Sequence, residues 1–492
     1  MRWIGEMNII EKGLSRKVFK SLTWVGSASL LSQLLSWAIT IVIVRQLTPD
    51  DFGLMAMAAV FWGFLTMIGD FGLFASIVQN KEITAEQLRE ISGFIVILNF
   101  LFLITTYFAS PVISGFFSEP RLTAILRTLC LVFLFIPFYI IPHSLLLREM
   151  NFRTTSIIDV LCNLSAAITS LVFALSGYGV WSLVYGTLVQ FLSRALSFSL
   201  VSKTFHKPLF ELKQIRKMLS FSSFFTGGTI LRYFFFKSDI IIGGKFIGSD
   251  ALGIYSIANQ LAFLPVEKMS NIIPQVAFPA FSKLQVDIKM YASNFLKGMK
   301  LLNLVFIPSY VVIFVLAEDI VDVLLGSKWA AIVEPMRILC LIMPLRAFEV
   351  LFIPAMNGLG KSNITMMTSG LSLIIMVSAF FVGIHWGYVG LCWAWVVGFM
   401  LVFSVTISLC IKIMQVDAAA LAGTYKTSVI AGAGLLILGV ALMTEGSRSM
   451  LPHIRIAAFL AASIILYAIS ILALDKPIVI YLKTILKSRR VE

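Results

Sequence analysis

Residues 91–112 read ISGFIVILNFLFLITTYFASPV, an apolar run without a single charged side chain. At about 1.5 Å of rise per residue, a helix of this length crosses a hydrocarbon core of roughly 30 Å. Comparable runs recur along the whole chain of 492 residues, which is 59% hydrophobic and only 13% charged. The surface of a soluble protein could not carry so much apolar side chain, so the sequence predicts an integral membrane protein.

The apolar runs predict an all-α protein with about fourteen transmembrane helices. A segment in lipid must satisfy its own backbone hydrogen bonds, and the residue-by-residue alternation of a barrel strand is absent. The predicted spans are 21–44, 52–76, 91–112, 121–142, 157–176, 179–202, 217–242, 251–280, 299–317, 331–354, 364–384, 387–411, 427–443 and 455–474.

The basic residues predict the orientation of these spans. Most of the 39 Lys and Arg residues lie at the two termini and in every second connection, such as 202–217 and 281–300. The positive-inside rule therefore places both termini in the cytoplasm of a bacterial inner membrane. Topology and contact with membrane lipid then explain the net charge of +14, and no nucleic-acid partner is predicted.

An internal repeat predicts how the helices are organised. Segment pairs recur in the same order: Arg16-Lys17 and Arg216-Lys217, LTPDDFGL (47–54) and IGSDALGI (247–254), LRTLCL (126–131) and MRILCL (336–341), Gly177-Tyr178 and Gly387-Tyr388. They predict a six-helix half over 1–207, a second over 208–414, and a final helix pair with a tail over 415–492. Because six is even, the halves share one orientation, as in parallel-repeat transporters that hold their solute between the halves.

Arg232 is the principal candidate for substrate binding. It lies deep in the seventh predicted span, where a charge costs roughly 3 kcal/mol or more. In the repeat it aligns with Ser32, and both first helices thus present polar groups to a shared cavity. A guanidinium is suited to binding a diphosphate through two parallel hydrogen bonds. The alternative is a structural pair with Asp239, seven residues later on the same helix face. The stripe around Ser32 consists of Ser29, Ser32, Gln33 and Ser36.

Two other basic residues are candidates for the same cavity. Lys237 lies nearer the periplasmic end of its span, so snorkelling to the headgroups is the alternative to substrate contact. Arg346 lies near the middle of the tenth span, three residues before Glu349, and this spacing also favours a structural ion pair.

Four acidic residues are candidates for coupling or gating. Asp239 and Glu349 are the possible partners of the basic residues above. Glu267, beside Lys268 in the eighth span, is either a proton or cation relay or one member of a neutralising pair. Asp70 lies at the cytoplasmic end of the second span, where a structural role is equally compatible with the sequence.

Other motifs indicate structure and not chemistry. Thr48-Pro49-Asp50-Asp51 has the pattern of a helix start, although paired acids in a periplasmic loop also occur in glycosyltransferases. GLGKS (358–362) lacks the first glycine of a phosphate loop, because Ala355 stands there. The five cysteines lie singly in apolar runs. No catalytic residue, metal site or cofactor is predicted.

Several strings resemble the polysaccharide-transporter branch of the multidrug/oligosaccharidyl-lipid/polysaccharide (MOP) flippase superfamily, of the colanic-acid and O-unit exporter type. They are LTPDDFGL (47–54), GDFGLFASIVQNKEI (69–83), LLLREMNFR (145–153), ALGIYSIANQL (251–261) and FPAFSKLQ (278–285). The resemblance implies a V-shaped two-lobed bundle with a central cavity. It also implies an undecaprenyl-diphosphate-linked oligosaccharide as cargo, moved to the periplasmic leaflet without ATP hydrolysis for lipopolysaccharide, capsule or exopolysaccharide synthesis. A coupling proton or cation and a polysaccharide polymerase are the further partners that it suggests.

Two other functions fit the sequence less well. A multidrug or cation antiporter of the same superfamily would favour carboxylates in its cavity, whereas the intramembrane excess here is basic. A membrane polymerase, ligase or glycosyltransferase usually carries a long periplasmic loop for its chemistry, and all the predicted periplasmic connections are short.

Overall fold

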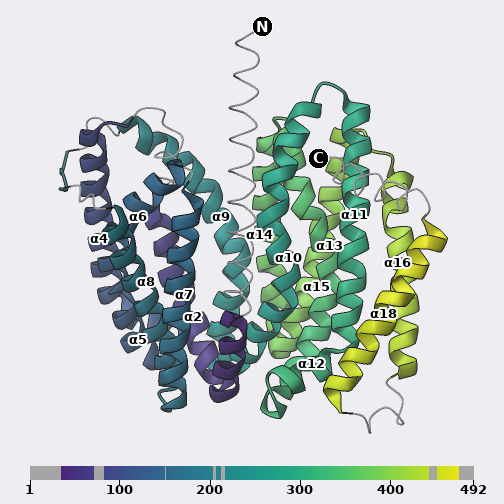
Figure 1. The fold of residues 1–492 in the computed structure, drawn as a ribbon, viewed down its shortest axis with the longest axis horizontal. Coiled ribbons are helices and arrows are strands. Elements are labelled where there is room, and N and C mark those ends of the chain that lie inside the picture. Colours follow the sequence, from purple (N-terminus) through teal and green to yellow (C-terminus); the bar gives the residue numbers. More distant parts are fainter. Residues whose placement is uncertain are drawn as a thin grey trace. The chain divides into compact units, whose positions relative to one another are not determined.

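The computed structural model describes residues 35–70, 83–149, 151–202, 207–211, 216–442 and 451–475, with the side chains of 70, 216–229 and 271 left aside. All regular structure within these ranges is helical (Figure 1). The predicted all-α class is confirmed, as expected where lipid leaves the backbone no other hydrogen-bond partner.

The chain divides into two compact units. The first comprises Met1–Tyr233 together with Gly248–Gly253, and the second comprises Phe234–Ile247 together with Ile254–Glu492. Helices α9 (Arg216–Phe246) and α10 (Gly248–Leu284) therefore contribute to both units. The division into repeat halves at residues 207 and 414 concerns sequence symmetry, and it stays a prediction.

The first unit is built on α4 and α6, whose contact forms its main core. Ile91 and Ile95 of α4 pack with Phe133 and Ile136 of α6, and all four side chains are buried. Helix α8 packs against both α6 and α7. The helices are α2 (Pro49–Asp70), α4 (Ala85–Phe117), α5 (Arg121–Leu129), α6 (Val132–Arg148), α7 (Phe152–Leu175) and α8 (Val180–Ser202), preceded by helical residues 35–46.

The second unit is centred on α13 (Val333–Gly358), which packs against α11, α14 and α15. In the most apolar stretch of the span Ser327–Gly358, which contains α13, 72% of the residues are buried, whereas the corresponding value for α18 is 11%. The other elements are α11 (Ile288–Val315), α12 (Ala317–Leu324), the 3-10 turns η1 (Ser327–Ile332) and η2 (Ile384–Trp386), α14 (Ser362–Gly383), α15 (Gly387–Met414), α16 (Ala418–Leu442) and α18 (Pro452–Leu474).

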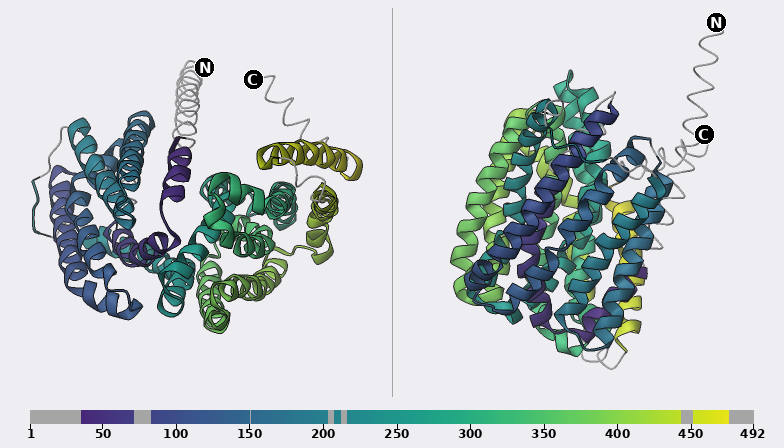
Figure 2. Two further views of the ribbon diagram at one scale, coloured as in Figure 1. Left: turned by 90° about the horizontal axis from the view of Figure 1, so that it is seen from below. Right: turned by 90° about the vertical axis from the view of Figure 1, so that its left-hand side faces the viewer.

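The C-terminal helix pair packs on the second unit through α11 (Figure 2). An ion pair fixes each end of α18. Arg455 near its start binds the buried Asp319 of α12 through two nitrogens. Asp475 directly after its end is buried and lies 2.5 Å from the ammonium group of Lys300 on α11.

Most predicted spans coincide with a membrane-length apolar helix. Ten segments of the described chain are long and apolar enough to cross a membrane, and one of them, Ser362–Met414, comprises α14 and α15. Helices α9 and α10, with 31 and 37 residues, are long enough but more polar. The first predicted span, 21–44, lies largely outside the described residues. The protein is therefore a multi-pass membrane protein.

Candidate functional site

A buried cation lies inside the second unit. Arg346 of α13 is 3% exposed, and its guanidinium carbon lies over four aromatic rings. The ring centroids of Trp395 and Phe263 are 4.4 and 4.5 Å away, and those of Phe236 and Phe399 are 5.5 and 5.6 Å away. Aromatic faces carry negative partial charge, so they stabilise a desolvated cation. The rings come from α9, α10 and α15, which therefore hold this side chain of α13 jointly.

A buried carboxylate lies beside this cation. Asp239 of α9 accepts hydrogen bonds from the Tyr255 hydroxyl (2.7 Å), the Trp395 indole nitrogen (3.3 Å) and the Asn259 amide (3.4 Å). Trp395 thus contacts both charges: its ring face lies on Arg346, and its N–H group donates to the Tyr255 hydroxyl (2.7 Å) and, at the longer distance of 3.3 Å, to Asp239. Arg346 is attracted by Glu349 and, less strongly, by Asp239, and Lys237 attracts the Asp239 carboxylate.

The helix-spacing pairs suggested by the sequence are not the contacts that the structure gives. In the described chain, the side-chain partners of Asp239 come from α10 and α15, and Arg232 is not among them. The guanidinium of Arg346 is directed into the aromatic cluster, and Glu349 one turn later on α13 adds an electrostatic attraction to it. The side chains of Asp239 and Arg346 are therefore stabilised mainly by contacts with other helices.

Arg232 lies near the middle of α9 and is exposed. Its neighbour Tyr233 donates a hydrogen bond to the carbonyl oxygen of Val60 on α2 (2.6 Å). Gly63 leaves room for this ring, since an added Cβ would lie 3.1 Å from the Tyr233 hydroxyl. Tyr233 therefore fixes this part of α9 against α2 within the first unit, and Arg232 is not covered by protein.

The other predicted site residues differ in exposure. Three of them are half-buried: Ser36 in the helical residues 35–46, Lys237 on α9 and Glu349 on α13. Glu267 on α10 is exposed. Asp70 is the last residue of α2, and its side chain is not described. Ser29, Ser32 and Gln33 lie outside the described residues. Their roles stay predictions.

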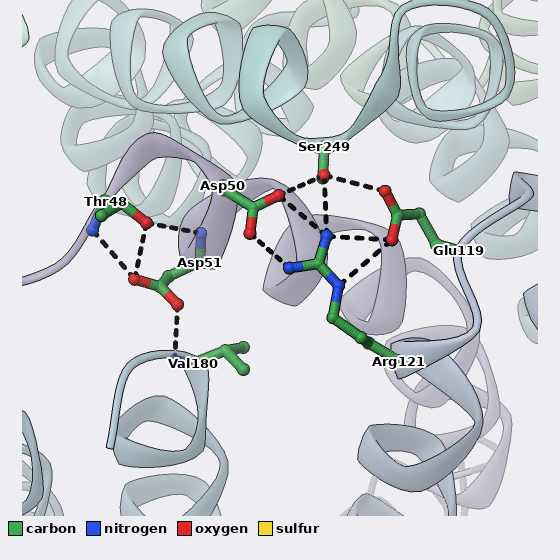
Figure 3. A network of polar contacts seen from close by, with 7 residues as sticks. All are labelled: Thr48, Asp50, Asp51, Glu119, Arg121, Val180 and Ser249. Atoms are coloured by element: carbon green, nitrogen blue, oxygen red, sulfur yellow. Dashed lines mark hydrogen bonds and ion pairs between the residues drawn. The ribbon is translucent and has the colours of Figure 1, made fainter. Parts of the chain in front are cut away.

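A polar network surrounds Asp50 at the start of α2 (Figure 3). Arg121 of α5 donates two hydrogen bonds to the Asp50 carboxylate, at 2.6 and 3.0 Å, and two more to Glu119, at 3.0 and 3.3 Å. Ser249 of α10 bonds Asp50 and lies 3.0 Å from Glu119. The guanidinium of Arg121 is thus shared by Asp50, in the first turn of α2, and Glu119, in the connection between α4 and α5.

Asp51 caps two helices in the same region (Figure 3). One carboxylate oxygen accepts from the backbone N–H group and the hydroxyl group of Thr48, at 2.9 and 2.8 Å. The other accepts from the backbone N–H group of Val180, the first residue of α8, at 2.8 Å. The helix-start interpretation of these residues is therefore confirmed, and both carboxylates are occupied by structural contacts.

The starts of α2 and α10 cross at paired glycines. A Cβ on Gly53 would lie 1.8 Å from the carbonyl oxygen of Ser249, and one on Gly253 would lie 1.7 Å from that of Pro49. The contact is reciprocal, because Gly53 corresponds to Gly253, and Pro49 to Ser249, in the predicted repeat. The strings 47–54 and 247–254, which suggested the repeat, thus lie against each other.

The sequence interpretation missed Tyr255, Asn259 and Trp395. Tyr255 and Asn259 are four residues apart in ALGIYSIANQL, so they share one face of α10, and that polar spacing could have indicated a buried partner. Trp395 lies in an apolar run and gave no such signal. Asp159 of α7, which bonds Arg194 of α8 at 3.0 Å, was also missed.

Comparisons with known proteins agree with this architecture. The family model described as polysaccharide biosynthesis protein matches residues 42–334. The teichuronic acid biosynthesis protein TuaB of Bacillus subtilis is 26% identical over 82% of this chain and 84% of its own length. The succinoglycan biosynthesis transport protein ExoT of Rhizobium meliloti is 25% identical over 66% of this chain and 65% of its own. The solved structure of the lipid II flippase MurJ in an inward closed conformation is 14% identical, with a TM-score of 0.75 over 92% of this chain and 100% of that chain, and it shows a shared fold.

Proposed function

Because the chain belongs to the polysaccharide biosynthesis protein family, we propose that it is a flippase for a lipid-linked oligosaccharide. The cargo is an undecaprenyl-diphosphate-linked oligosaccharide that serves lipopolysaccharide, capsule or exopolysaccharide synthesis. The transport function in the name of ExoT and the flippase function in the name of MurJ support this assignment.

One observation carries the proposal: Arg232 is exposed near the middle of a 31-residue helix. At 1.5 Å per residue it lies roughly 20 Å from the end of α9 at Phe246, too far for its side chain to reach the headgroups. A charge at this depth is costly in lipid and is typical of a substrate path. The exposed guanidinium of Arg232 suits a diphosphate, which it would bind through two parallel hydrogen bonds.

The exposed Arg232 favours this anionic cargo over an organic cation. An antiporter for cationic drugs needs a carboxylate that its substrate can reach. Asp239 is fully buried and bonded by Tyr255, Asn259 and Trp395, so it does not meet this need, and Glu267, which is exposed, is assigned to coupling. An enzymatic role for Asp50 and Asp51 is disfavoured for a similar reason, since both are held in structural contacts.

The remaining features of the transport cycle complete the proposal. The protein resides in the bacterial inner membrane with both termini in the cytoplasm. Lys237 contributes positive charge on the substrate path, and Arg346, enclosed by aromatic rings in this structure, would do so only in another conformation of the cycle. Asp239, Glu267, Glu349 and Asp70 serve in coupling to a proton or cation or in gating. A polysaccharide polymerase receives the translocated unit.

Substitution of Arg232 tests the proposal. Arg232→Ala should abolish export of the surface polysaccharide while the protein still inserts, and Arg232→Lys should retain part of the export because the charge survives without the bidentate fork. Membrane abundance and surface polysaccharide are measured together. Lys245→Ala, in the last turn of the same helix, is the matched control and should export normally.

A double variant separates substrate binding from a structural pair. If Arg232 served only to neutralise Asp239, Arg232→Ala combined with Asp239→Asn would restore export. We expect no restoration, because Asp239 is bonded by Tyr255 and Trp395. Full export by the double variant would remove Arg232 from the substrate site.

A further inference from the structure

A cavity of about 420 Å³ lies in the second unit where α11, η1, α13 and the start of α15 meet. Its walls are mainly apolar and include Phe314, Ile338 and Leu341. Three polar residues also line it: Glu334, Arg337 and Tyr388. Ligand sites of small molecules have this size and this combination of apolar walls with a few polar groups.

The polar groups of this cavity have unused hydrogen-bonding capacity. Arg337 donates its Nε hydrogen to the carbonyl oxygen of Phe314 (3.3 Å). One terminal nitrogen lies 3.8 Å from Glu318, whose side chain is 73% exposed, so this pair is weak. Within the described chain, the carboxylate of Glu334 and the hydroxyl group of Tyr388 form neither a hydrogen bond nor an ion pair. A cation and an anion three residues apart on α13 thus both remain available to a ligand.

The cavity lies at headgroup depth on a lipid-facing side of the helices. Arg337 is four residues from the start of α13, or roughly 6 Å along its axis. Leu341, one turn further in, is 50% exposed, and Trp386, two residues before Tyr388, is 71% exposed. Apolar side chains exposed on a spanning helix face lipid tails, and tryptophan and tyrosine gather at the headgroup boundary.

We propose that this cavity binds the headgroup of phosphatidylethanolamine. The lipid phosphate binds the guanidinium of Arg337 and the hydroxyl of Tyr388, the ammonium group binds the carboxylate of Glu334, and the acyl chains leave along Leu341. The site is a lipid site separate from Arg232, and it holds one lipid per chain.

Charge complementarity selects this lipid. Phosphatidylglycerol offers a phosphate for Arg337 but has no positive group for Glu334, whose carboxylate would repel it. Phosphatidylcholine has the right charges, but its quaternary ammonium has no N–H group to donate. Only a primary ammonium provides both the charge and the hydrogen bonds that a carboxylate accepts.

Lipid titration of the purified full chain tests the site. The detergent-solubilised protein receives phosphatidylethanolamine, phosphatidylglycerol or phosphatidylcholine, and native mass spectrometry records bound lipid while thermal unfolding records stabilisation. We expect one retained phosphatidylethanolamine per chain. Arg337→Gln and Glu334→Gln should each weaken its binding by about tenfold, since each removes a charge-assisted hydrogen bond.

Three further variants make the test specific. Asp250→Asn changes an exposed acid in the first turn of α10, outside the cavity lining, and should leave lipid binding unchanged. Tyr388→Phe should weaken binding with little change in lipid-free stability, and Ala331→Trp should fill the cavity. Equal retention of phosphatidylglycerol, or unchanged binding in both Glu334→Gln and Arg337→Gln, would overturn the proposal. If Ala331→Trp does not fold, the two charge variants decide the outcome.

Discussion

Trp395 contacts both Arg346 and Asp239, two buried charged side chains of the second unit, so its removal should show how strongly they depend on each other. Trp395→Phe keeps a ring over Arg346 but removes the N–H donor to Asp239. We expect a loss of about 1–3 kcal/mol in the free energy of unfolding, because a buried carboxylate loses a hydrogen bond. Phe399→Leu, which removes only a ring 5.6 Å from Arg346, is the control and should lose less. Thermal unfolding in detergent is the measurement.

The partners of these charges could not be read from the sequence. Arg346 and Asp239 are conspicuous because charges are rare in membrane spans, and both were identified on that ground. Helical spacing offered only Glu349 and Arg232 as partners. The actual partners, Tyr255, Asn259 and Trp395, come from α10 and α15, and tertiary packing alone brings them together.

At the scale of the elements, the crossing of α2 and α10 should tolerate no side chain at its glycines. Gly53→Ala or Gly253→Ala places a Cβ under 2 Å from a backbone carbonyl oxygen, so the helices must separate. Overpacking of this kind destabilises by typically 1–3 kcal/mol. Gly370→Ala in α14, where nothing lies within 4 Å, should instead be neutral or slightly stabilising. Similar unfolding temperatures for Gly53→Ala and Gly370→Ala would contradict the close crossing.

Long apolar helices were predictable as elements, whereas their interruptions were not. The span predicted over 121–142 is divided at Cys130-Leu131 into α5 and α6, because the apolar run continues through the bend and gives no breaker signal. The short helix α12 and the turn η1 were not predicted either, because they lie in the connection between two predicted spans. Length and hydropathy identify a crossing, but they do not report where helix geometry changes within it.

At the scale of the whole molecule, the ion pairs of α18 show that this helix runs antiparallel to α11. Lys300, in the first half of α11, lies beside Asp475 at the end of α18. Asp319 of α12, which follows α11, lies beside Arg455 at the start of α18. The orientation in the membrane stays a prediction: reporter fusions should indicate cytoplasm in 281–300 and periplasm near Gly326. Opposite signals at the two sites would reverse the orientation, and identical signals would discard the intervening span.

The pair of Asp319 and Arg455 also gives the chain a late step in its synthesis. Asp319 leaves the ribosome long before Arg455, and burying its carboxylate alone would cost several kcal/mol. We therefore expect this part of the second unit to reach its final packing only after the last helix has been inserted. A chain that stalls before Arg455 would keep an unpaired carboxylate at Asp319.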